Sequence, residues 1–318
     1  MKVLQISKTR GHDCGIALFA DNLQKQARRA GIHIENSSGW AQSSDADLVL
    51  LHHHDELFSD GEVSSLASAC TVPIVLFAHS DGAGRFSDVL QGFVAMCPGM
   101  IGPISKPVGI FPHPAWVPNR LEDRASLRME FKLPQTRPVV GTNGFLKFER
   151  QFAEIAGALL PEVRRNRWFL ELITSPWRLE SRGVLAELES LRREYADCFR
   201  FEYTFLESET LNRRLQSCDL LWCWTAASSS PYGSGVIADQ YASGTRIIAA
   251  DKLQHAHILG LPNTVVGPAE LLPFVRCITT ELAGGRFERH DPFPVSWENW
   301  TEGFRSFLEV VLVRARRP

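Results

Sequence analysis

A segment rich in serine and glycine, residues 228–239, contains the groups of this chain best suited to bind a phosphate. It lies between two continuous apolar runs, residues 220–224 and 245–250, which predict buried parallel strands. A segment of this kind that opens a helix exposes backbone N–H groups at the positive end of the helix dipole, where an anion binds. Asp239 is expected about one turn inside that helix, where its carboxylate can reach a ribose hydroxyl.

A second segment, residues 141–150, is basic and begins within the predicted strand 139–142. Lys147 and Arg150 lie three residues apart, so that they share one face at a helix entrance, and together they suit a diphosphate. The glycines of this segment let the backbone approach a ligand closely. Taken alone, the two cations are more typical of a solvated helix start than of an anion site. Beside the serine- and glycine-rich segment, they favour an anion site.

Histidines supply a third group of candidates. His79 follows the predicted strand 72–77, where it could hydrogen-bond a sugar or shuttle a proton, although a bond to a backbone carbonyl is the plain alternative. The run His52-His53-His54 resembles a metal site. Consecutive residues of an extended chain point to opposite sides, however, so we expect no metal there.

Composition excludes several classes of protein. With 318 residues the chain is long enough for two domains, and 44% apolar residues argue against disorder. The formal net charge of -2 gives no attraction to nucleic acid or anionic lipid. No apolar run is long enough to span a membrane, and the N-terminus does not have the pattern of a signal peptide. The seven cysteines form no Cys-x-x-Cys, which indicates reduced thiols in a cytoplasmic protein.

Strand-like and helix-like segments alternate along the whole chain. In the first half, a helix over 16–30 ends at Gly31, and the predicted strands are 3–6, 32–34, 47–51, 72–77 and 108–111. The second half has predicted strands at 139–142, 168–173, 199–203, 220–224 and 245–250, and helices at 152–163, 211–216 and 297–313. We predict an α/β fold of two Rossmann-like, doubly wound domains facing a central cleft.

The expected domain boundaries follow from this alternation. Residues 1–118 form the first domain, and the polar stretch 119–136 is a linker, either a hinge or a short helix. Residues 137–295 form the second domain, and 296–318 form a last helix that returns to the first domain.

The chain resembles the GT-B glycosyltransferases, in particular the retaining enzymes of the family-4 type that use nucleotide sugars. In the first half the resemblance depends on residues 14–17, 23–31 and 75–79. In the second half it depends on 144–150, 218–222 and 233–244, and the closing Ser296-Trp297-Glu298 adds to it. It covers nearly the whole chain.

The resemblance implies a role for each matching position. Lys147 and Arg150 fall at the basic pair on the donor diphosphate, and His79 falls beside the transferred sugar. Asp239 matches a Glu on the nucleotide ribose. The remaining implied donor-binding positions are Gly15, Phe205 near the base, and Tyr232, Gly233, Ser234 and Gly235 in the phosphate loop.

One departure from the family pattern stands out. The family has two Glu separated by seven residues, and the counterpart of the first falls at Pro231, or at Ser230 with one insertion. Since that Glu lies beside the donor sugar, its loss leaves the donor and the activity open.

The resemblance implies a hexosyltransferase that moves a sugar from a nucleotide-diphosphate donor to a glycan, lipid-linked or small-molecule hydroxyl. The expected mechanism is retaining and uses neither a metal nor a cofactor, because the cations and loop amides stabilise the leaving diphosphate. No nucleic-acid partner is expected, whereas contact with a membrane surface stays open. A catalytically silent GT-B protein that binds a nucleotide sugar, or supports a partner enzyme, and a nucleotide-sugar epimerase are the alternatives.

Overall fold

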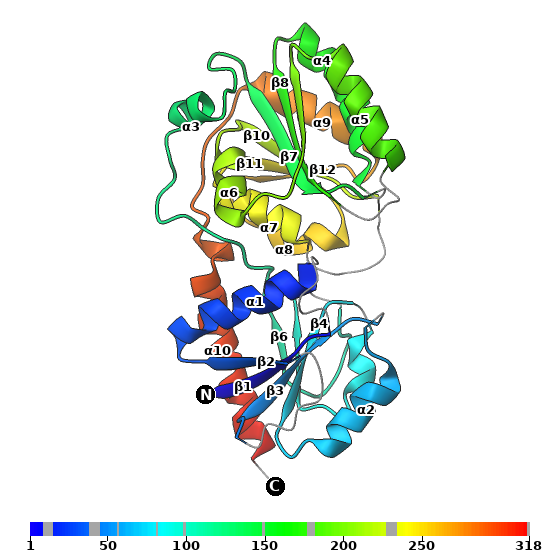
Figure 1. The fold of residues 1–318 in the computed structure, drawn as a ribbon, viewed down its shortest axis with the longest axis vertical. Coiled ribbons are helices and arrows are strands. Elements are labelled where there is room, and N and C mark those ends of the chain that lie inside the picture. Colours follow the sequence, from blue (N-terminus) through cyan, green and yellow to red (C-terminus); the bar gives the residue numbers. More distant parts are fainter. Residues whose placement is uncertain are drawn as a thin grey trace. The chain divides into compact units, whose positions relative to one another are not determined.

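The computed structural model describes residues 1–8, 15–37, 45–55, 57–80, 82–97, 100–147, 150–176, 182–226 and 234–316. These residues form two compact units (Figure 1). Unit 1 comprises the described residues within 1–114 together with those from Trp297 onward, and unit 2 comprises those from Ala115 to Ser296. In the part of the chain that the structure describes, no helix is both long and apolar enough to cross a membrane.

Unit 1 is built on a six-stranded parallel sheet in the order β2-β1-β3-β4-β5-β6. Its strands are β1 (Lys2–Ile6), β2 (His33–Ser37), β3 (Leu48–His53), β4 (Ile74–Ala78), β5 (Gly92–Ala95) and β6 (Val108–Ile110). All residues of β3, β4 and β5 are buried, as expected for a parallel sheet covered on both faces. The strand order reverses between β1 and β3, and open α/β sheets bind ligands at such a switch point.

The helices of unit 1 are α1 (Gly15–Ala27) with the 3₁₀ turn η1 (Arg28–Ala30), α2 (Asp60–Ala69), the 3₁₀ turn η2 (Ala83–Phe86) and α10 (Trp297–Ala315). Gly31 ends η1 with a φ of 73°, which confirms the expected glycine cap. The last helix, α10, belongs to this unit because Trp300, Phe304 and Leu308 are buried in its core. It also contacts α1.

Unit 2 repeats the plan with a second six-stranded parallel sheet, in the order β12-β11-β10-β7-β8-β9. Its strands are β7 (Val139–Phe145), β8 (Phe169–Ser175), β9 (Phe199–Tyr203), β10 (Leu220–Cys223), β11 (Arg246–Ala250) and β12 (Thr264–Gly267). Numbered from β7, this is the strand order of dinucleotide-binding domains, with its switch point between β7 and β10.

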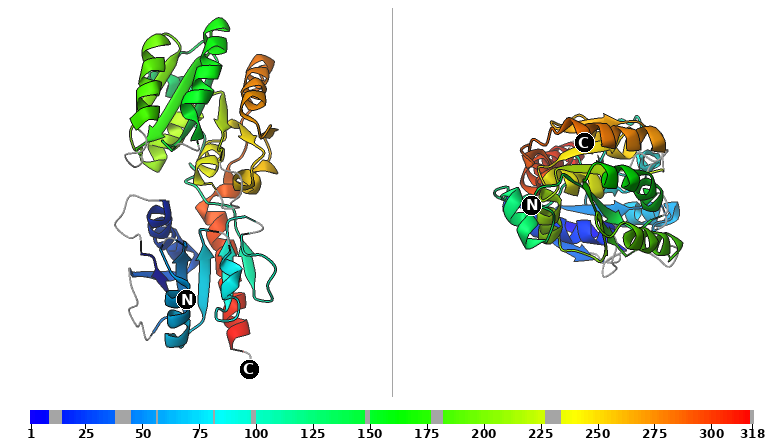
Figure 2. Two further views of the ribbon diagram at one scale, coloured as in Figure 1. Left: turned by 90° about the vertical axis from the view of Figure 1, so that its right-hand side faces the viewer. Right: turned by 90° about the horizontal axis from the view of Figure 1, so that it is seen from above.

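Helices cover both faces of the second sheet (Figure 2). They are α3 (Arg124–Glu130), α4 (Phe152–Arg165), α5 (Arg182–Glu194), α6 (Ser208–Gln216), α7 (Gly235–Ala242), α8 (Ala256–Leu259) and α9 (Leu271–Gly284), with the 3₁₀ turns η5 (Leu253–His255) and η6 (Phe293–Val295). One core packs under α4, α5 and α9, and the other under α6, α7 and α8. The prediction of two doubly wound α/β domains is confirmed.

The stretch 119–136, expected as a linker, contains α3 and is bound to unit 2 by buried charges. Arg124 Nη1 lies 3.0 Å from Asp219 Oδ1, and Arg128 pairs with Asp219 Oδ2. The same carboxylate accepts a bond of 2.7 Å from the amide of Val139 at the start of β7. These contacts fix α3 against the first strand of the second sheet.

Candidate functional site

The candidate residues of unit 2 gather at the switch point between β7 and β10. Arg150 follows β7, and Ser234 precedes α7, the helix that follows β10 along the chain. Because β7 and β10 are parallel neighbours, their carboxyl ends lie at the same edge of the sheet. The two segments singled out from the sequence therefore meet there.

Arg150 connects them directly. Its Nη2 donates to Ser234 Oγ over 3.2 Å, and its Nη1 donates to the carbonyl oxygen of Trp224 over 3.0 Å. No carboxylate among the described residues pairs with this partly buried guanidinium. By contrast, Arg200 binds Glu171 through two hydrogen bonds of 2.7 and 2.8 Å. A partly buried cation without a carboxylate, which still has donors to spare, suits an anionic ligand.

A buried thiol and imidazole lie behind Arg150. Arg150 Nη1 is 3.8 Å from Cys223 Sγ, and Cys223 Sγ is 3.5 Å from His255 Nε2. His255 Nδ1 faces the carbonyl oxygen of Ala250 at 2.9 Å, so Nδ1 carries the proton and Nε2 accepts from the thiol. Burial raises the pKa of Cys223 to about 11 and lowers that of His255 to about 4, so both are neutral. Because both are neutral, they place no second charge beside the Arg150 guanidinium.

Ser234 and Gly235 form the start of α7. Ser234 is the residue before the helix; its side chain makes no capping bond to α7, and its hydroxyl accepts from Arg150. Gly235, which the resemblance assigned to the phosphate loop, is the first residue of α7. Tyr232 and Gly233, together with Ser230 and Pro231 at the counterpart of the missing Glu, lie outside the described residues.

Asp239 lies one turn into α7, as expected, and is partly buried. Burial raises the pKa of its carboxyl group to about 7. No described residue donates a hydrogen bond to this carboxylate. An unpaired acid near the start of a helix is poised to accept bonds from ligand hydroxyls.

Lys147 and Phe205 occupy the same sheet edge. Lys147 is partly buried just after β7, and its carbonyl oxygen accepts from the amide of Arg150 over 3.1 Å. Phe205 follows the edge strand β9, and 53% of its surface is exposed. Three strand spacings separate β9 from β10, or about 14 Å. Phe205 therefore makes no contact with the Arg150 cluster.

In unit 1, His79 directly follows β4, and its amide donates to the carbonyl of His53 over 2.9 Å. Its Nε2 lies 2.9 Å from His52 Nδ1, and its ring stacks on Phe77 with 4.9 Å between centroids. Phe19 of α1 packs edge-on against His79 at 5.8 Å. Burial lowers the pKa of His79 well below its ordinary value, so the side chain is a neutral hydrogen-bonding group at pH 7.

The consecutive histidines divide as the strand alternation predicts. His52 faces Phe77 and His79, whereas His53 packs against Phe58 and Phe86 on the other side of β3. They cannot ligate one ion together. His113 packs on Phe19 at 5.5 Å and contacts the carbonyl of Pro114 through Nδ1.

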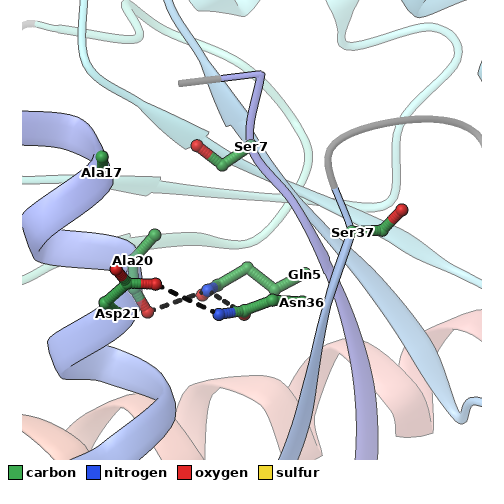
Figure 3. A pocket seen from close by; sticks show the side chains of 7 residues that line it. All are labelled: Gln5, Ser7, Ala17, Ala20, Asp21, Asn36 and Ser37. Atoms are coloured by element: carbon green, nitrogen blue, oxygen red, sulfur yellow. Dashed lines mark hydrogen bonds between the residues drawn. The ribbon is translucent and has the colours of Figure 1, made fainter. Parts of the chain in front are cut away.

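Gly15 is the first residue of α1, the helix that carries Phe19 to His79. Near the carboxyl ends of β1 and β2, polar side chains line a small recess beside α1 (Figure 3). The residues around the recess are Gln5, Ser7, Ala17, Ala20, Asp21, Asn36 and Ser37.

Sequence reasoning did not identify Gln5, His52 or His255 as parts of either site. Gln5 offered one signal, since it is a polar residue inside the apolar run 3–6 and is 1% exposed. A buried amide must find partners, and its partners lead to His79, as shown below.

Comparison with solved structures identifies the fold. HepE of Anabaena bound to UDP superimposes with a TM-score of 0.71 at 11% identity, and the match covers 100% of both chains. A sucrose-phosphate synthase of Thermosynechococcus elongatus gives a TM-score of 0.66 at 14% identity, over 99% of this chain and 97% of that one.

The pneumococcal O-GlcNAc transferase GtfA, in complex with UDP and GlcNAc, gives 0.61 at 12% identity, over 83% of this chain and 57% of the other. The chain therefore has the two-domain GT-B fold of these proteins. No protein-family model and no curated protein sequence matches it.

Proposed function

We propose that this protein is a glycosyltransferase that transfers a sugar from a nucleoside diphosphate to a hydroxyl acceptor. The observation that carries the proposal is the Arg150 guanidinium at the switch point of unit 2, bonded to Ser234 at the start of α7 and without a carboxylate partner. The solved structures of this fold include complexes with UDP and UDP-glucose, which makes UDP-sugars the first donors to test.

The diphosphate would bind between Arg150 and the first turn of α7. A guanidinium can chelate two phosphate oxygens, and a helix N-terminus adds backbone N–H donors and a partial positive charge. Lys147, three residues before Arg150, would supply the second cation. Gly235 has no side chain to hinder the approach of a phosphate to the helix.

Asp239 would bind the ribose. The hydroxyl groups of a ribose donate to an ionised carboxylate, and Asp239 has no competing donor among the described residues. Phe205, exposed after β9, would contribute apolar surface near the base. His79 would hydrogen-bond the transferred sugar.

The chemical step breaks the bond between the anomeric carbon and the diphosphate and forms a bond between that carbon and the acceptor oxygen, whose proton passes to the departing diphosphate. The departing diphosphate gains negative charge, and Arg150, Lys147 and the α7 amides would stabilise it more in the transition state than in the bound donor. These groups can serve as the electrophilic partner of the leaving group without a metal ion. We propose retention of the anomeric configuration, as the GT-B resemblance implies.

The proposal is tested with purified protein and a panel of UDP-, GDP- and dTDP-sugars. A thermal-shift screen should reveal the donor by a rise in the midpoint of unfolding, because ligand binding stabilises the folded state. Release of nucleoside diphosphate in the presence of candidate acceptors then measures turnover, and the anomeric configuration of the product shows whether transfer retains it. Tight binding without any turnover would contradict the enzyme assignment, and donor isomerisation without an acceptor would indicate an epimerase.

A further inference from the structure

A continuous series of polar side chains runs through unit 1 from the recess to His79. Gln5 Nε2 donates to the carbonyl of Ala20 over 2.9 Å and to Asn36 Oδ1 over 2.6 Å. Figure 3 shows both amide side chains directed toward α1. Asn36 Nδ2 in turn donates to Gln24 Oε1 over 2.9 Å, and Gln24 Nε2 donates to the carbonyl of Ile34 over 3.0 Å.

The two backbone carbonyls give this series a direction. A carbonyl oxygen only accepts, so the NH₂ group of Gln24 must face Ile34, and the NH₂ group of Gln5 must face Ala20. Each amide therefore has its oxygen at the opposite end. Gln5 Oε1 lies 2.9 Å from His52 Nε2, and because this oxygen can only accept, His52 Nε2 must carry a proton.

The same donor and acceptor order extends through His52 to His79. Burial lowers the pKa of His52 to about 3, so the ring is neutral at pH 7 and carries one proton. With that proton on Nε2, His52 Nδ1 has only a lone pair. His79 Nε2, at 2.9 Å, must then donate to it. A neutral His79 that donates through Nε2 presents Nδ1 as an acceptor.

We propose that Gln5 and His52 are positioning residues that hold His79 as the Nε2-protonated tautomer, with Nδ1 as a hydrogen-bond acceptor for a hydroxyl of the transferred sugar. The part that concerns the sugar rests on the function proposed above. The site thereby becomes selective, because the sugar group beside His79 must be a proton donor. A keto, methoxy or fluoro substituent at that position would leave Nδ1 without its bond.

Packing prevents the rings from rotating out of this arrangement. Phe77 stacks against both imidazoles, with its ring centroid 5.2 Å from that of His52 and 4.9 Å from that of His79. Phe19 makes edge-on contacts with both imidazole rings. The ionisable groups that act on His79 are His52, His113, His53 and His54. Since these are all histidines, the ionisable groups that act most strongly on His79 disfavour its imidazolium form.

Nitrogen-15 NMR of the full-length protein tests the tautomer without any ligand. In protein labelled with ¹⁵N-histidine at pH 7, we expect a proton on Nε2 of both His52 and His79. We also expect a scalar coupling across the hydrogen bond between His79 Nε2 and His52 Nδ1. His79→Gln identifies the signals. A proton on His52 Nδ1, or an imidazolium at His79, would overturn the inference whether or not the protein binds sugar nucleotides.

The functional arm compares His52→Phe with His53→Phe. His52→Phe preserves the stacking on Phe77 but removes the side-chain acceptor of His79, whereas the imidazole of His53 makes no hydrogen bond to His79 and the main-chain bond between the two residues is kept in His53→Phe. For His52→Phe we expect affinity for the UDP-sugar to fall about 3- to 10-fold while affinity for UDP changes less than about twofold. His53→Phe, with a matched unfolding midpoint as the folding control, should leave both unchanged.

The two arms separate failure of this inference from failure of the proposed function. Equal losses for UDP and UDP-sugar in His52→Phe, or no loss for either, would contradict the sugar contact. Absence of any UDP or UDP-sugar binding to the wild type would refute the proposed function, and the NMR result would still decide the tautomer.

Discussion

Arg150 and His79 each follow a parallel strand, but Arg150 offers a ligand a positive charge, whereas His79 is held neutral by its surroundings. The guanidinium of Arg150 lies against a main-chain carbonyl and a hydroxyl at the start of α7. His79 loses its charge through burial and lies at the end of a series of neutral amides and imidazoles. Unit 2 is therefore equipped for an anion, and unit 1 for an uncharged group with hydroxyls.

The largest effect should come from removing the charge in unit 2. Arg150→Ala is expected to lower turnover about 100- to 1000-fold, because the leaving diphosphate loses its main electrostatic partner. Steady-state release of UDP from the identified donor measures this. Arg164→Ala is the matched control, since Arg164 is an exposed arginine of unit 2 paired with Asp197. Wild-type turnover in Arg150→Ala would remove Arg150 from the mechanism.

Asp239 extends the comparison to an ionisable acid. Ligand hydroxyls donate to the ionised form of Asp239, and with a pKa of about 7 this form becomes populated as pH rises through 7. Affinity for UDP-glucose should therefore increase over this range. UDP-glucose is suitable because its esterified phosphates do not titrate in this range. Asp239→Asn should bind about 10-fold more weakly at pH 8 and lose the pH dependence. A calorimetric titration at pH 6 and pH 8 measures both, and an unchanged pH profile in the variant would refute the ribose contact.

The carboxyl group of Asp239 also affects the stability of the unliganded protein, and this stability should decrease as pH rises. A raised pKa means that the folded state holds this proton more tightly than the unfolded chain does. Its stabilising contribution is thus complete below about pH 4 and is lost as pH rises through 7. The free energy of unfolding of Asp239→Asn minus that of the wild type should be about 1 kcal/mol larger at pH 8 than at pH 5, after allowance for partial exposure. Urea unfolding at the two pH values provides the test.

A smaller effect is expected from the hydroxyl that orients Arg150. Ser234→Ala removes one bond of 3.2 Å but leaves the bond from Arg150 to Trp224, so affinity for UDP should fall about 3- to 5-fold. A loss as large as that of Arg150→Ala would show that Ser234 contacts the ligand itself. Calorimetry with UDP distinguishes these results.

Salt offers the finest distinction between the two units. Affinity for UDP should weaken with added NaCl, and Arg150→Ala should reduce that dependence by about twofold, because screening acts on the charge that has been removed. His79→Gln should leave the salt dependence as in the wild type. Equal salt dependence in Arg150→Ala and the wild type would break the division between a charged and a neutral site.

Much of the fold was predictable because buried parallel strands are continuous apolar runs. The predicted strand 199–203 has the same bounds as β9, and the predicted strand 220–224 is one residue longer than β10. The strands β5 and β12, with four residues each, were not predicted, nor was α9. The strand β10 is equally short but is an unbroken run of apolar residues, whereas β5 and β12 each include a glycine at one end, which weakens the strand pattern.

The sites were less predictable, because their contacts depend on strand order. Arg150 and Ser234 are 84 residues apart and meet only because β10 pairs with β7. Gly141 was interpreted as a position of close approach to a ligand, yet an added Cβ there would lie 2.6 Å from Cys218 Sγ. That glycine is required by packing inside unit 2. The series from Gln5 to His79 likewise needs β1, β3 and β4 side by side, which no local pattern shows.

The most direct test of the charged site is a calorimetric titration of the wild type and Arg150→Ala with UDP and with UMP. If Arg150 and α7 bind the diphosphate, the wild type prefers UDP to UMP by at least about tenfold, and Arg150→Ala loses most of that preference. Equal affinity of the wild type for the two nucleotides, or an unchanged preference in Arg150→Ala, would contradict the account.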